Sequence, residues 1–187
     1  RRWLRTKKSI RNAVVEQIAV KDISKITVTE VAKIADINRK TFYLHYDSVC
    51  SVLNEIENDV ANMIMEILNK IDLKDSYYNP YLILKILNEI NTMLNNDIDF
   101  YSDVMKSPLS NNLINKIKNA LKVELSNKIT RKLNMSDEAL YIYIEFIVTG
   151  ILASYQQWFN SKSKLSLEKL SKAIEQIAFY GINGILE

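Results

Sequence analysis

The sequence predicts an all-α protein of about nine helices, and three observations lead to that class. Only three glycines occur in 187 residues, and none precedes Gly150. The clustered glycines of a P-loop or a dinucleotide fingerprint are therefore missing. Only two prolines occur, and apolar residues recur at helical spacing while strand-like alternation is rare.

The first 46 residues predict three short helices. Apolar residues at helical spacing indicate a first helix over about 3–21. Thr27 and Glu30 form a capping-box pattern, in which each side chain satisfies the other residue's backbone N–H at the start of a helix. Asp36-Ile37-Asn38 ends that helix, and Asn38 is a good N-cap for a third helix over about 39–45.

Start signals continue through the rest of the chain. Asp47 or Ser48, Ser136 and Ser166 are suitable caps, and Asn79-Pro80 and Ser107-Pro108 each place a proline in a first turn. The helices predicted from these signals span about 48–73, 80–96, 98–106, 108–133, 137–160 and 167–186.

The last two predicted helices are apolar over more than one face. Leu140, Ile144, Ile147 and Ile151 mark one stripe, and further apolar residues lie off it. Glycine inside a helix costs about 1 kcal/mol relative to alanine, so Gly150 and Gly181 suggest that another helix approaches closely. These helices are expected either to form a homodimer interface or to be a well-buried pair within one chain.

Composition argues against several classes of protein. One cysteine, Cys50, excludes an intrachain disulfide and fits a reducing cytoplasm. With a single histidine as well, neither a metal site nor another cofactor is expected. The chain also offers few of the side chains that catalysis needs, so an enzyme is not expected. No run of 18 apolar residues predicts a membrane span, and the N-terminal segment lacks a signal-peptide pattern.

Charge is distributed unevenly. Residues 1–46 carry eleven Lys and Arg against four Asp and Glu, or +7, whereas 47–187 carry fourteen against eighteen, or −4. This asymmetry is consistent with a polyanion that meets the N-terminal segment alone, although a solvated basic face would look similar.

Two helices joined by a three-residue break are typical of a helix-turn-helix, whose second helix enters the DNA major groove. The predicted core of this small domain is Val31, Ala35, Ile37, Phe42 and Tyr46. The predicted DNA-facing residues are Arg39, Lys40, Thr41 and Leu44. Arg and Lys donate to guanine, while Thr and Leu can touch a thymine methyl.

Thr27-Val28, Val31-Ala32, Ala35, Ile37 and the run Arg39 to Tyr46 resemble the DNA-binding domain of the TetR (tetracycline-repressor) family of transcription regulators. Residues 146–186 are similar to the C-terminal helices of Firmicutes-type members, and RKTFYLHY is similar to the subgroup near the dihydroxyacetone-kinase operon regulator. The resemblance implies a DNA-binding domain over 1–47 and an effector-binding and dimerisation domain over 48–187.

The resemblance also implies roles for individual residues. Thr27, Tyr43 and His45 would contact phosphates, and the four DNA-facing residues would approach bases. An Ω-shaped homodimer would form through the last two helices and bind a palindromic operator as a regulator, here expected to be a repressor. The alternative is a helical adaptor that binds protein, or a co-activator controlled by a protein without a small-molecule ligand.

The sequence departs from the family pattern at two positions. Asp36 stands where a turn glycine is usual, so the aspartate must adopt a conformation that glycine prefers, or the turn differs. Val49 stands where a phosphate-facing lysine is usual. Five basic residues could compensate as an arm on the DNA, or could form a disordered tail: Arg1, Arg2, Arg5, Lys7 and Lys8.

An effector would lie among the middle helices, if the family pattern holds. No arginine or lysine stands out there as an anchor for an anion, so a small apolar or aromatic effector is favoured over a charged one. A partner protein is the other possibility that the family offers. The candidate wall residues are Tyr81, Phe100, Tyr101, Met105, Tyr143 and Phe146.

Overall fold

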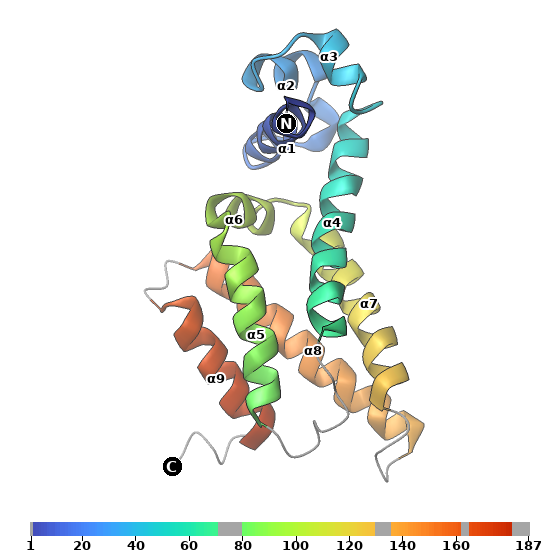
Figure 1. Cartoon of the computed structure of the whole chain (residues 1–187), viewed down its shortest axis with the longest axis vertical. Helices are drawn as coiled ribbons and strands as arrows, with labels where there is room; N and C mark the ends of the chain where they lie inside the picture. The colour runs from blue at the N-terminus through green and yellow to red at the C-terminus, as the bar shows by residue number, and fades with distance from the viewer. Residues whose placement is uncertain (1, 71–79, 130–135, 162–164, 181–187) are drawn as a thin grey trace. The chain divides into compact units, whose positions relative to one another are not determined.

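The computed structural model describes residues 2–70, 80–129, 136–161 and 165–180. Within these ranges the chain is helical and contains no strand, which confirms the predicted all-α class (Figure 1). Its elements are α1 (Arg2–Ile18), a 3₁₀ turn η1 (Ile23–Lys25), α2 (Val28–Ile34), α3 (Arg39–Tyr43), α4 (Val49–Asn69), α5 (Pro80–Asn95), α6 (Ile98–Lys106), α7 (Ser110–Ile129), α8 (Asp137–Asn160) and α9 (Leu167–Tyr180).

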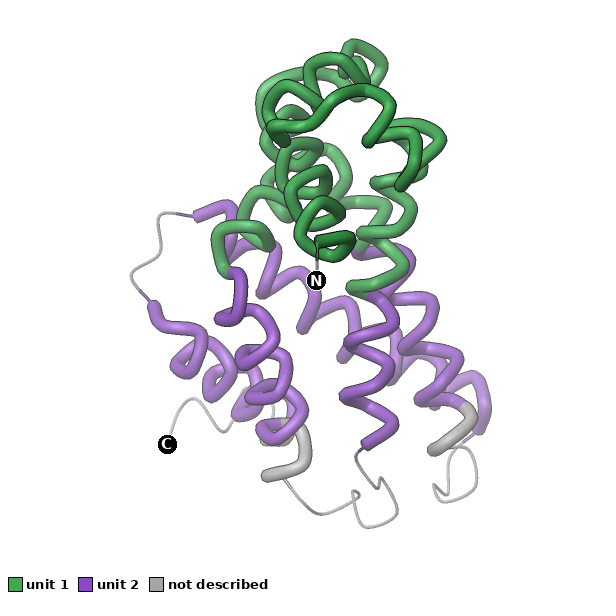
Figure 2. Tube along the Cα trace, turned by 45° about the horizontal axis from the view of Figure 1, so that its top comes forward, with its two compact units in different colours: residues 1–60, 98–113 green, residues 61–97, 114–187 purple. Residues whose placement is uncertain are grey.

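The chain divides into two compact units (Figure 2). Unit 1 comprises residues 1–60 and 98–113, and unit 2 comprises 61–97 and 114–187. This division differs from the boundary predicted after Asp47 for two reasons. Helix α4 continues without a break through Val60, and α6 packs against α1 although it follows much later in the sequence.

The core of unit 1 is built from one face of each of its first helices. Ile10 and Val14 of α1, Val31 of α2 and Phe42 of α3 are completely buried. Tyr46 is also buried, as predicted, whereas the predicted core residues Ala35 and Ile37 are only half-buried. Those two residues flank the turn between α2 and α3, where the chain runs along the surface.

The turn between α2 and α3 is a Schellman motif centred on Asp36. The Asp36 N–H donates to the Lys33 carbonyl at 3.3 Å, and the Ile37 N–H donates to the Ala32 carbonyl at 2.9 Å. Asp36 has φ of 52°, the left-handed conformation that glycine usually supplies at this position. The aspartate has therefore taken up the glycine-like conformation.

Substitutions at Asp36 are expected to separate backbone strain from side-chain loss. Asp36→Gly should leave the free energy of unfolding unchanged or raise it by up to about 1 kcal/mol, because glycine adopts this φ without strain. Asp36→Val should lower it by about 1–2 kcal/mol, since a β-branched residue is strained there. Urea denaturation measures both, with Asp36→Asn as the neutral control. Full stability of the valine variant would contradict the account.

Unit 2 is formed by α5, α8 and α9 together with most of α7 and the end of α4. Leu140, Ile144 and Val148 of α8 form a buried cluster against Leu121 and Leu125 of α7. Among the described helices, α8 is the one that is long and apolar enough to cross a membrane, which differs from the sequence expectation, but the core helix of a soluble protein passes the same test.

Gly150 lies in the middle of α8 and does not mark a close helix approach within the chain. A Cβ atom added at this position would meet no atom of the described residues within 4 Å. The reason predicted for this glycine is therefore wrong for contacts inside one chain. Gly181, the corresponding position of the last helix, lies outside the described residues.

A ring of three hydrogen bonds joins α5, α8 and α9. The Tyr155 hydroxyl donates to Asn91 Oδ1 at 2.8 Å, and Asn91 Nδ2 donates to Ser171 Oγ at 2.7 Å. With its hydrogen used on Asn91, Tyr155 accepts from the Ser171 hydroxyl at 3.1 Å. Asn91 Nδ2 also donates to the Leu167 carbonyl at 3.2 Å. The ring satisfies these polar groups in a buried site, where burial raises the pKa of Tyr155.

Tyr155→Phe is expected to lower the free energy of unfolding by about 1–3 kcal/mol, because it leaves Asn91 Oδ1 buried without its donor. The matched control is Tyr141→Phe, which removes an exposed hydroxyl on the same helix and should change stability by less than about 0.5 kcal/mol. Equal effects of the two substitutions in urea denaturation would show that the ring adds nothing.

Candidate nucleic-acid interface

Helix α3 is held in place by its caps and by one buried side chain. Asn38 Oδ1 accepts from the Thr41 N–H at 2.7 Å, so it is the N-cap that the sequence predicted. Phe42 is completely buried, and its ring packs edge-on at 5.6 Å from that of Tyr43. The opposite side of the helix is thereby fixed toward solvent.

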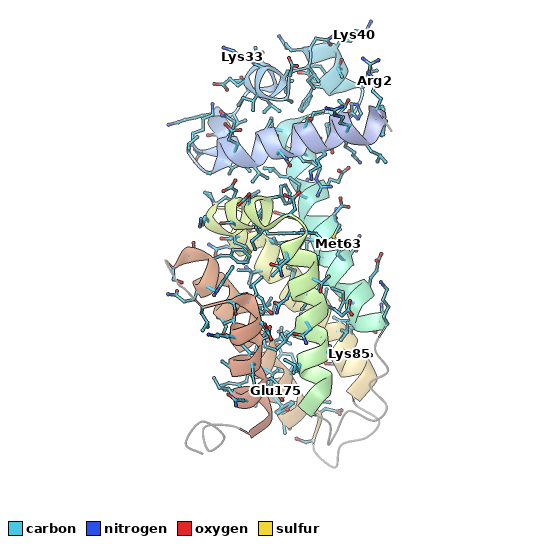
Figure 3. The ribbon with its side chains drawn as sticks, turned by 60° about the vertical axis from the view of Figure 1, so that its left-hand side comes forward. Arg2, Lys33, Lys40, Met63, Lys85 and Glu175 are labelled. Carbon is cyan, nitrogen blue, oxygen red and sulfur yellow. The ribbon has the colours of Figure 1, made fainter. Side chains whose placement is uncertain are left out.

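The solvent side of α3 carries two cations and two large apolar groups. The side chains of Arg39 and Lys40 are exposed, and neither side chain forms a hydrogen bond or ion pair with another described residue. Tyr43 is 49% exposed and Leu44 is 65% exposed. Figure 3 shows Lys40 of α3, Lys33 of α2 and Arg2 of α1 extending outward at one end of this unit. This surface combines free donors with apolar groups.

Thr41, also a predicted base contact, has already used its only hydrogen. The Thr41 hydroxyl donates to Asn38 Oδ1 at 3.0 Å, beside the capping bond from its own N–H. The side chain is half-buried. It therefore presents a methyl group and oxygen lone pairs rather than a free donor.

Thr27 is likewise engaged within the chain. Its N–H donates to Glu30 Oε2 at 3.0 Å and its Oγ1 accepts from the Glu30 N–H at 3.3 Å, which forms the predicted capping box, and its hydroxyl also donates to Glu30 Oε2 at 2.8 Å. Glu30 also accepts from Lys21 Nζ at 2.8 Å. The Lys21 ammonium, followed by the Thr27 donors, lowers the pKa of Glu30 to about 2. A phosphate would have to compete with this carboxylate for the Thr27 hydroxyl.

His45 stacks on Trp3, a residue that the sequence reading did not identify. The ring centroids of Trp3 and His45 lie 3.7 Å apart. His45 Nδ1 is buried and has no hydrogen-bond partner among the described residues. Burial lowers the pKa of His45, and the nearby Lys7 ammonium lowers it further. The imidazole is therefore neutral at neutral pH in the free protein. The stack joins the start of α1 to the end of α3.

The basic N-terminal residues from Arg2 onward belong to helix α1, not to an extended arm or a tail. Lys7 Nζ pairs with Glu55 Oε2 at 2.5 Å, and Arg11 pairs with Asp59 at 2.7 Å. Lys7 and Arg11 lie four residues apart on α1, and Glu55 and Asp59 lie four residues apart on α4. Two cations of α1 therefore face two carboxylates of α4. This matched spacing was the sequence signal that could have predicted the contact.

Tyr46 and Phe100 complete this cluster. The Tyr46 hydroxyl donates to Glu55 Oε1 at 2.7 Å, and burial, followed by Glu55, raises the pKa of Tyr46. The Arg11 guanidinium lies 5.7 Å from the centre of the Phe100 ring on α6. Arg11 therefore contacts both α4 and α6, and the cluster stiffens the helices that carry α3.

The predicted wall residues of an effector pocket fall into separate groups. Phe100, Tyr101 and Met105 lie on α6 in unit 1, with Tyr101 buried. Tyr143 and Phe146 lie on α8 in unit 2, where they are 47% and 72% exposed. Unlike wall residues, these two lie on a face of α8 turned away from its buried cluster. The side chain of Tyr81 lies outside the described residues.

Residues 83–180 match the family model of the TetR-type transcriptional regulator C-terminal region. The match covers 98 of the 187 residues. In sequence the chain is also 24% identical over 172 residues to ATP synthase subunit delta of Rickettsia rickettsii (strain Sheila Smith), covering 89% of each chain. An identity of that size does not establish kinship.

Solved structures of transcription regulators share the fold. The fatty acid degradation regulator FadR from Bacillus halodurans has a TM-score of 0.68 at 16% identity and covers 95% of this chain and 96% of its own. FadR from Bacillus subtilis, in complex with stearoyl-CoA, has a TM-score of 0.63 at 18% identity, and the match covers 94% of this chain and 98% of that one. The dihydroxyacetone kinase operon activator DhaS has a TM-score of 0.60 at 20% identity, and the match covers 95% of this chain and 96% of that one. With its family match and this fold, the chain belongs to the TetR family of transcriptional regulators.

Proposed function

We propose that this regulator binds a palindromic operator as a homodimer in the cytoplasm, with α3 of each chain in the major groove. The observation that carries the proposal is the solvent side of α3, where Arg39 and Lys40 are exposed and uncommitted on a helix anchored by Phe42. Such donors match guanine O6 and N7 in the groove. The +7 charge of residues 1–46 supplies attraction to phosphates.

Arg39→Ala is expected to cost about 1–3 kcal/mol of operator binding and to relax preference at one base position. The comparison variant replaces Arg2 and Arg5 by alanine, which should weaken binding to all sequences alike and flatten the salt dependence. Both are measured by titrating the operator and a scrambled duplex at several salt concentrations. Unchanged sequence preference in Arg39→Ala would remove α3 from the role of reading helix.

The proposed dimer uses the exposed face of α8 together with α9. Ile142, Phe146, Gly150 and Ala153 fall on one side of α8, and all are exposed within the chain. This side carries no charged residue from Ala139 to Asn160. The open space over Gly150 supports a second helix there, since small residues let helix backbones approach. The residues after Tyr180 lie outside the described part of the chain.

A small apolar effector is proposed to switch operator binding, with Phe100, Tyr101 and Met105 of α6 as its candidate contacts. The support is the apolar and soft character of these side chains, together with the apolar acyl chain of the stearoyl-CoA bound by the FadR of Bacillus subtilis; the charged CoA part of that ligand is not what these side chains match. Stearoyl-CoA should raise the melting temperature and weaken operator binding, whereas CoA alone should do neither. If neither compound acts, control by a partner protein is favoured.

A second candidate is a helical protein-binding subunit without DNA contacts. The sequence similarity to ATP synthase subunit delta favours it. A protein-binding role does not explain why the side chains of Arg39 and Lys40 are exposed and uncommitted beside the exposed Leu44. Salt-dependent binding to duplex DNA distinguishes the candidates, because a protein-binding subunit would show none.

A further inference from the structure

We infer that the outer row of α3 selects its half-site by thymine methyl groups, which Leu44 and Thr41 contact, while Lys40 supplies a donor beside them. The inference rests on the proposed function and goes further, because it states which chemical feature of a base pair these residues detect.

Helical geometry places Leu44 and Lys40 at the outermost line of α3. Phe42 is completely buried. Each residue turns the side-chain direction by 100°, so positions two before and two after Phe42 point to the opposite side. Leu44 and Lys40 are also four residues apart and lie one above the other. The Leu44 N–H donates to the Lys40 carbonyl at 3.1 Å, which keeps Leu44 in helical register.

An apolar side chain at this position has one natural partner in DNA. Leu44 is 65% exposed and has no polar side-chain atom. In the major groove thymine is the only base that presents a methyl group. Packing against that methyl would remove both groups from water, whereas every other base edge would leave Leu44 facing a polar group without compensation.

The hydrogen bonds of Thr41 restrict it in the same direction. Its hydroxyl hydrogen goes to Asn38 Oδ1, the oxygen that also caps the helix. Guanine O6 and N7 are acceptors, so Thr41 would contact guanine only by giving up that bond. Its methyl group is free to pack against a thymine. Its lone pairs could instead accept from the amino groups of cytosine or adenine, and the test below separates these cases.

The test begins with selection of duplexes from a random library by the wild-type protein. In the selected operator each thymine is then replaced, one at a time, by deoxyuridine, which removes only the methyl group. Affinity should fall about three- to fivefold at one or two positions in each half-site, the effect of one methyl-sized group no longer removed from water. Positions outside the α3 contacts should show no change.

Three variants assign the methyl-sensitive positions. Leu44→Ala should bind the unmodified operator more weakly and lose the deoxyuridine effect at one position. Thr41→Val keeps the methyl and loses the hydroxyl, so it should keep the deoxyuridine effect at the Thr41 position. Thr41→Ser keeps the hydroxyl and loses the methyl, so it should lose the effect at the Thr41 position. Leu44 is exposed, and thermal melting checks that each variant is folded.

The possible failures are distinguishable. Selection of no sequence would overturn the proposed function itself. A selected half-site without thymine, or one in which no deoxyuridine replacement weakens binding, would overturn the methyl inference and leave DNA binding intact. Strong weakening by Thr41→Val with full binding by Thr41→Ser would show that Thr41 acts through its hydroxyl, as expected for contacts to amino groups.

Discussion

Replacing Phe42 by alanine is expected to lower the free energy of unfolding by about 3–5 kcal/mol and to abolish operator binding. Phe42 is completely buried beneath α3, and it is the only buried residue within that helix. A helix of five residues has little stability of its own, so its position depends on this contact. Thermal melting and operator titration measure the two effects.

Tyr43 provides the matched control, because it is the adjacent aromatic residue and is 49% exposed. Tyr43→Ala should change the free energy of unfolding by less than about 0.5 kcal/mol. It should weaken binding to the operator and to a scrambled duplex to a similar degree, as expected for a phosphate contact. A Phe42→Ala protein that retained wild-type stability and affinity would contradict the anchoring role assigned to the ring.

Gly150→Leu is expected to give a folded monomer whose operator affinity falls on the order of 100-fold or more. Inside the chain the new side chain meets open space, and leucine favours a helix by about 1 kcal/mol over glycine. At a dimer interface the same side chain would hold two α8 helices apart. A monomer binds only one half-site, so the gain from linking two reading helices is lost.

Val123 of α7 offers a control for this experiment, since it is apolar and exposed but lies on a different helix. Val123→Ser should leave the oligomeric state and the operator affinity unchanged. Sedimentation equilibrium gives the state of each variant. If the Gly150→Leu protein remained a dimer with full affinity, the exposed face of α8 would not be the dimer interface.

The elements that the sequence predicted best are those specified by residues close together in the chain. The capping box of Thr27 and Glu30, the N-cap at Asn38 and the glycine-like turn at Asp36 each involve residues within five positions of one another. Local hydrogen bonding determines such features, so they are visible without knowledge of the tertiary structure.

Contacts between distant residues were not predicted. Trp3 stacks on His45, and Arg11 pairs with Asp59, 48 positions away. Periodicity gives no sign of the stack, and for the ion pair the sequence offers only the matched four-residue spacing of the cations on α1 and the carboxylates on α4. The exposed Phe146 shows the same limit, because an apolar residue on a long helix can face its own core or another chain. Periodicity predicts that a face is apolar but not what covers it.

Titration of the wild-type protein with its selected operator, at several salt concentrations and with the stoichiometry measured, tests the central claim most directly. We expect two chains on a palindrome whose half-sites lie roughly 34 Å apart or a small multiple of that, the repeat of the DNA helix. Affinity should fall linearly with salt on logarithmic axes. Binding of one chain per duplex, or equal affinity for operator and scrambled DNA, would contradict it.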